Sequence, residues 1–176
     1  MEEIKSRLPD ELSTINFFVV EPAKVRYLDG SQPLFGQQFQ SKFPSVDYEL
    51  SEAGSCLALG RATASVFHLM RVMETGLRAA SACLGHSVLA STDRNWGAIL
   101  RNMRDARQAK GGKWAEADLF SEMYAMLDAV KNAWRNQTMH IDQKYTEEEA
   151  EMIFIAVKHF MQKIASRMDE NGLPLA

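Results

Sequence analysis

The sequence contains little cysteine: Cys56 and Cys83 are the only two among 176 residues. We place both in one long helix, 27 residues apart, where a rise of about 1.5 Å per residue separates them by roughly 40 Å. A disulfide needs Cα atoms within about 7 Å, so we expect none within the chain. The sequence also lacks a CxxC motif and a paired-histidine spacing, the usual signs of a zinc site. We therefore expect no metal and no other cofactor.

The sequence has neither an excess of positive charge nor a long apolar run. The formal net charge is -3, which excludes binding to nucleic acid through bulk charge, so any RNA contact has to be local. The first five residues are charged and lack the apolar stretch of a signal peptide, and no apolar run is long enough to span a membrane. Two thiols suit a reducing compartment. These features predict a soluble, cytoplasmic protein.

Proline is rare after residue 45, because four of the five prolines precede it. The same region holds the turn-forming sequence Asp29-Gly30-Ser31. We therefore predict an N-terminal arm over residues 1–45 and a helical bundle over residues 46–176. The short apolar runs 17–20 and 25–28 leave two alternatives: a hairpin of short strands, or an irregular arm packed on the bundle. An isolated hairpin is marginally stable, so either alternative needs a partner surface.

From Val46 onward, apolar residues recur at steps of three and four, which predicts helices. We expect an all-α bundle of four main helices, one of them very long and bent near His68. The sequence Thr146-Glu147-Glu148-Glu149 predicts a capping box at the start of the last helix. A helix much longer than its neighbours leaves apolar surface uncovered, which favours a homodimer. The expected helices cover residues 46–84, 94–109, 113–136 and 147–169.

The residues best suited to catalysis lie at the end of the third expected helix. Arg135 falls in its last turn, and His140 lies just beyond it. Arginine binds phosphate with a planar fork of donors, and histidine exchanges protons near neutral pH. Together they suffice for RNA cleavage without a metal, and two copies of His140 at a dimer interface would supply both a base and an acid. The alternative is structural: the arginine interacts with the helix dipole and the histidine caps carbonyls.

Arg135, the polar Asn136 directly after it, and His140 after three more residues resemble the motif of the HEPN superfamily. The stretch 64–74 is also similar to a set of bacterial proteins that carry this motif. The resemblance covers roughly residues 46–169. It implies a dimeric helical bundle, and many members are metal-independent endoribonucleases of toxin–antitoxin or phage-defence systems, so RNA and an antitoxin protein are implied partners. Because some members are inactive, the alternative function is a non-catalytic module that binds nucleotide or RNA, or one that mediates interactions.

Four further residues are expected to support this site. Arg71 and Glu74 interrupt the apolar pattern of the long helix, and Glu74 can pair with Arg71 or with Arg78. Either these groups form a basic wall that holds RNA phosphates beside Arg135, or they form a solvated salt-bridge network. Asn132 and Asp128 precede Arg135 on the same helix face and could orient its guanidinium. The resemblance implies that Asn136 binds phosphate or orients His140.

Overall fold

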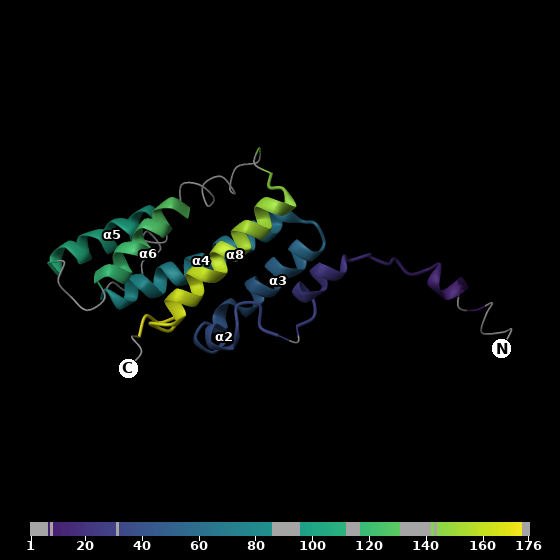
Figure 1. Cartoon of the computed structure of the whole chain (residues 1–176), viewed down its shortest axis with the longest axis horizontal. Helices are drawn as coiled ribbons and strands as arrows, with labels where there is room; N and C mark the ends of the chain where they lie inside the picture. Colours follow the sequence, from purple (N-terminus) through teal and green to yellow (C-terminus); the bar gives the residue numbers. More distant parts are fainter. Residues whose placement is uncertain are drawn as a thin grey trace.

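A computed structural model describes residues 7, 9–30, 32–85, 96–111, 117–130, 142 and 144–173. Within these residues the regular elements are all helices and no strand forms, which confirms the predicted all-α bundle (Figure 1). No helix in the same part of the chain is long and apolar enough to cross a membrane. The elements are η1 (Pro22–Tyr27), α2 (Gln37–Lys42), η2 (Pro44–Val46), α3 (Asp47–Ala58), α4 (Ala62–Cys83), α5 (Trp96–Ala109), α6 (Ala117–Val130) and α8 (Glu147–Ala165).

The prediction of one very long helix over residues 46–84 is wrong, because α3 and α4 are separate helices that pack against each other. The break is at Gly60, whose φ of 70° lies in the left-handed region that glycine enters most easily. Its N–H donates to the carbonyl of Leu57 at 3.2 Å, and Arg61 N–H donates to that of Cys56 at 2.7 Å. These two bonds form a Schellman motif, which ends α3 and turns the chain back.

The α3–α4 hairpin is antiparallel, as side-chain contacts on either side of Gly60 show. The hydroxyl of Ser65 donates to the carbonyl of Ala53 at 2.8 Å in the buried core. One turn further from the break on each helix, His68 meets Glu49. Because the two helices run side by side, α4 is covered by α3 as well as by α8 and α5. Helix length therefore gives no support for a homodimer.

Helix α4 is the centre of the molecule, with α8 beside it along much of its length (Figure 1). Gly76 allows this close approach, because a Cβ atom there would come within 2.6 Å of the Met161 sulfur. Helix α8 begins with the predicted capping box, which is confirmed: Glu149 N–H donates to Thr146 Oγ1 at 3.2 Å, and Thr146 N–H donates to the Glu149 carboxylate at 2.8 Å. The helix ends at Ala165, four residues before the predicted end.

The region predicted to be an arm divides into two parts. From Pro22 to Val46 the chain folds into η1, α2 and η2, so the alternative of paired short strands is wrong for this part. Its aromatic side chains enter the core: Phe35 and Phe39 contact each other, and Phe35 packs edge-on against Phe154 of α8. The Tyr27 hydroxyl also donates to the Glu151 carboxylate at 2.9 Å. This segment is therefore an integral layer of the bundle.

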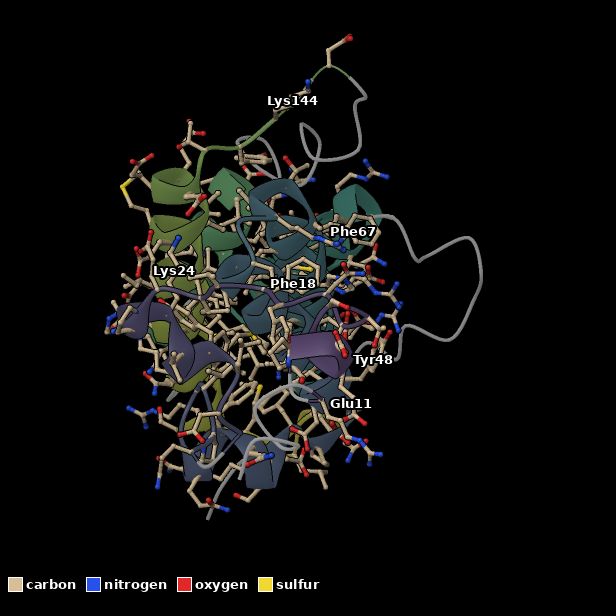
Figure 2. All side chains as sticks on the ribbon, turned by 90° about the vertical axis from the view of Figure 1, so that its right-hand side faces the viewer. Glu11, Phe18, Lys24, Tyr48, Phe67 and Lys144 are labelled. Atoms are coloured by element: carbon tan, nitrogen blue, oxygen red, sulfur yellow. The ribbon has the colours of Figure 1, made fainter. Side chains whose placement is uncertain are left out.

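The preceding part of the arm leaves large apolar side chains in solvent. Phe18 is 77% exposed, and Phe17 and Val19 beside it are also exposed. The segment leads away from the bundle in Figure 1 and projects toward the viewer in Figure 2, where Phe18 is labelled. Most of the surface of these three side chains is therefore open to solvent in the described part of the chain.

Candidate functional site

The residues predicted to carry catalysis, Arg135 and His140, lie outside the described residues, as do Asn132 and Asn136. The structure does describe Arg71, Glu74 and Asp128. Arg71 and Glu74 line one hollow together, whereas Asp128 is not among its lining residues.

The hollow has a volume of about 420 Å³ and lies on the outer face of α4. Its walls come from η2, the start of α3, the central turns of α4 and the first residue of α5. Arg71, Thr75 and Arg78, which helical spacing places on one face of α4, all line it. The lining residues are Ser45, Val46, Glu49, Phe67, Met70, Arg71, Glu74, Thr75, Arg78 and Trp96.

Glu49, a residue that the sequence analysis missed, organises one side of the hollow. Its side chain is only 13% exposed; the carboxylate accepts a hydrogen bond from His68 Nδ1 at 2.8 Å and forms an ion pair with Arg71 Nη2 at 2.8 Å. The one-helix interpretation placed Glu49 almost 30 Å from His68 along a single axis, at about 1.5 Å per residue. Gly60 was the sequence signal for the hairpin that brings the two together.

The two arginines of the hollow are held by different carboxylates. Arg71 pairs with Glu49, whereas Glu74 pairs with Arg78 one turn along α4. Of the two partners predicted for Glu74, the structure thus selects Arg78. The Arg71 side chain remains 56% exposed, and a guanidinium has five N–H donors. With one nitrogen on Glu49, its other donors are positioned to bind an anion that enters the hollow.

The charges that line the hollow balance to near neutrality. Arg71 and Arg78 face Glu49 and Glu74, so the hollow offers oriented donors rather than a strong positive field. The more exposed of the two pairs, Arg78–Glu74, contributes little to stability, about 0–1 kcal/mol. Both pairs orient a guanidinium, which favours a specific phosphate contact over nonspecific attraction.

The described end of α6 lies on a different side of α4 from Arg71. Val130 and Met126 share an apolar hollow with Met73 of α4 and Phe160 of α8. Met73 is two residues from Arg71, which corresponds to about 200° around a helix. Within one chain, the structure therefore does not place the described part of α6, including Asp128, against the Arg71 hollow. Asp128 makes an interaction of its own within the structure.

His68 has a second set of neighbours behind Glu49. The side chains of Glu52 and Cys56 approach it from α3. Burial raises the pKa of the Cys56 thiol, and the nearby Glu52 carboxylate raises it further, while Arg61 opposes them. Neither cysteine forms a disulfide.

Comparison of the chain with family models, with curated proteins and with solved structures finds no match.

Proposed function

We propose that the protein is a HEPN-like, metal-independent endoribonuclease that works as a homodimer, with Arg135 and His140 as its catalytic residues. The observation that carries the catalytic proposal is the Arg135-Asn136-x3-His140 pattern in a chain that folds as an all-α bundle. The hollow lined by Arg71 is consistent with an RNA substrate, because the exposed Arg71 guanidinium offers hydrogen-bond donors to a phosphate.

The proposed reaction needs only groups that the chain supplies. The imidazole of one His140 takes the proton of a ribose 2′-hydroxyl, and that oxygen attacks the adjacent phosphorus. The bond from phosphorus to the 5′-oxygen breaks, and the protonated His140 of the second copy returns a proton to the leaving oxygen. Arg135 stabilises the charge on the phosphoryl oxygens, and Asn136 binds phosphate or orients His140. The products are a 2′,3′-cyclic phosphate and a 5′-hydroxyl.

The reaction is tested by incubating the purified chain with RNA in excess EDTA and identifying the new ends. We expect cleavage that leaves cyclic phosphate and 5′-hydroxyl ends. The matched control is the same oligonucleotide with a 2′-O-methyl group at every ribose, which lacks the attacking hydroxyl and should remain intact. Cleavage of the methylated strand, or no cleavage of either strand, would exclude this mechanism.

The Arg71 hollow leads to a prediction about binding. Arg71→Ala should weaken RNA binding about tenfold at every sequence, because it removes one phosphate contact, and should reduce the salt slope of log K by about 1. Fluorescence anisotropy with a labelled RNA at several salt concentrations measures both. Arg26→Ala is the control, since Arg26 is an exposed arginine that pairs with Glu151 away from the hollow. If both variants behave alike, the hollow does not bind RNA.

The exposed part of the arm supports the proposed homodimer and indicates which segment takes part. Phe17 and Phe18 carry large apolar surface that the described part of their own chain does not cover. Burial of an aromatic side chain stabilises an interface by about 1.5–3 kcal/mol. The proposed mechanism needs two copies of His140. A second copy of the chain is therefore the partner expected to cover Phe17 and Phe18.

The dimer is therefore predicted to weaken when these side chains become polar. Replacing both Phe17 and Phe18 with serine should raise the dimer dissociation constant by about 100-fold or more, from roughly 3 kcal/mol of lost apolar burial. Sedimentation equilibrium measures the constant. The exposed Leu173 at the opposite end of the chain provides the control, and Leu173→Ser should leave the constant unchanged. An unchanged constant in the double variant would place the interface elsewhere.

A non-catalytic RNA- or nucleotide-binding module is the second candidate. The near balance of charge in the hollow favours it, because paired guanidiniums can hold a ligand without cleaving it. Under this alternative, RNA binding depends on Arg71, whereas no new RNA ends form in EDTA. The cleavage and anisotropy measurements together therefore separate the two functions.

A further inference from the structure

Three metal-ligating side chains of different chemistry meet on the α3–α4 hairpin. Glu52 and Cys56 are one turn apart on α3, so they share a face of that helix. The turn at Gly60 brings His68 of α4 to the same place. One potential ligand atom from each of the three residues lies within 4.8 Å of the other two. Oxygen, sulfur and nitrogen ligands of these types are those that zinc prefers.

The spacing is close to what a tetrahedral zinc site requires. Bonds of about 2.0–2.3 Å place neighbouring ligand atoms roughly 3.3–3.6 Å apart. The present separations of up to 4.8 Å exceed that by about 1.5 Å at most, a distance that side-chain rotations within staggered wells can close. Three protein ligands would leave the fourth position to solvent.

His68 is already held in the orientation that a metal ligand needs. An ionised carboxylate only accepts hydrogen bonds, so His68 Nδ1 must donate to Glu49 across the 2.8 Å contact. The unprotonated nitrogen of the neutral ring is then Nε2, which can bind a cation. A histidine fixed by a carboxylate through its other nitrogen is the usual arrangement at protein metal sites. Arg71 holds Glu49 in turn at 2.8 Å.

Glu52 supplies a separate observation, because its charge is not compensated nearby. It is partly buried and makes no hydrogen bond or ion pair with any residue that the structure describes. It lies instead beside the Cys56 sulfur and the His68 ring, with the three ligand atoms within 4.8 Å of one another. A cation at this position would offset the charge of the partly buried Glu52 carboxylate.

We propose that Glu52, Cys56 and His68 bind a zinc ion that links α3 to α4. The ligands come from two helices that are joined by a tight turn. No short motif such as CxxC therefore marks the site in the sequence, which is why the sequence predicted no metal. The ion lies behind Glu49, outside the hollow. Its role is to hold the hairpin and, through Glu49, the orientation of Arg71, while the proposed cleavage chemistry remains independent of metal.

Cobalt(II) is the probe for this site, because a thiolate bound to cobalt gives a charge-transfer band that carboxylate and imidazole do not give. Titration of the metal-free protein should produce the band with one cobalt per chain, and added zinc should abolish it. Cys56→Ser should lose the band and Cys83→Ser should keep it. No band in the wild type, or a band that survives Cys56→Ser, would overturn the proposal.

Two further measurements keep the test independent of folding defects and of RNA. In the unmodified protein, zinc should slow alkylation of Cys56, mapped by mass spectrometry, at least tenfold, while Cys83 serves as the internal reference. Equal effects on both thiols would contradict the site. Glu49→Gln should keep the cobalt band but weaken binding by about 10–100-fold, as expected for a residue that orients a ligand. An unchanged affinity would exclude that positioning role.

Discussion

Replacing His140 with alanine is expected to lower the rate of RNA cleavage by about 100-fold to 10,000-fold, the usual contribution of a general acid or base. In a homodimer the substitution removes both the base that activates the 2′-hydroxyl and the acid that protonates the leaving oxygen. The loss should fall on kcat with KM nearly unchanged, because the phosphate contacts of the hollow remain. The measurement is the initial rate on a labelled RNA oligonucleotide in EDTA.

The matched control is His159→Ala, which removes an exposed histidine from α8. That variant should cleave at the wild-type rate. Arg135→Ala should lose about 100–1,000-fold, the effect of removing one group that stabilises the transition-state charge. If the His140 and His159 variants cleave equally fast, His140 has no catalytic role, and the binding module becomes the better interpretation of the same motif.

The sequence predicted the class of fold and the capped start of α8, and it failed where a local turn decides the topology. Apolar residues recur at steps of three and four through both α3 and α4, so their periodicity alone is the same for one helix or two. The decisive residue is Gly60, because a glycine costs only about 1 kcal/mol inside a helix but also allows the left-handed turn that ends one. Burial of α4 by α3 then selects the hairpin.

Part of the candidate site could likewise be predicted from the sequence, and part could not. The face shared by Arg71, Thr75 and Arg78 follows from helical spacing alone, and all three line the hollow. Glu49 and the group of Glu52, Cys56 and His68 depend on a contact between two helices, which no local pattern encodes. The motif at Arg135 and His140 is a sequence prediction, and its residues lie outside the described part of the chain.

Phe39→Ala is expected to lower the free energy of unfolding by about 3–5 kcal/mol, as for other fully buried phenylalanines. Phe39 is 1% exposed, stacks on Phe43 with ring centroids 5.2 Å apart, and also contacts Phe35. Phenylalanines at intervals of four from residue 35 to 43 were a sequence signal for a buried segment, although only Phe39 lies within α2. The proline-rich surroundings concealed it, because they favoured an arm. Urea denaturation followed by far-UV circular dichroism measures the change.

The size of this effect decides whether residues 22–46 belong to the core or only cover it. A small domain is stable by about 5–15 kcal/mol, so the expected loss is a large fraction of the total. Tyr48→Ala is the control, since this aromatic residue of α3 is 68% exposed and should change stability by no more than about 0.5 kcal/mol. A loss below about 1 kcal/mol for Phe39→Ala would mean that the bundle folds without this segment. A full loss would mean that α3, and with it the hollow and the proposed zinc ligands, is positioned by the aromatic residues that precede it.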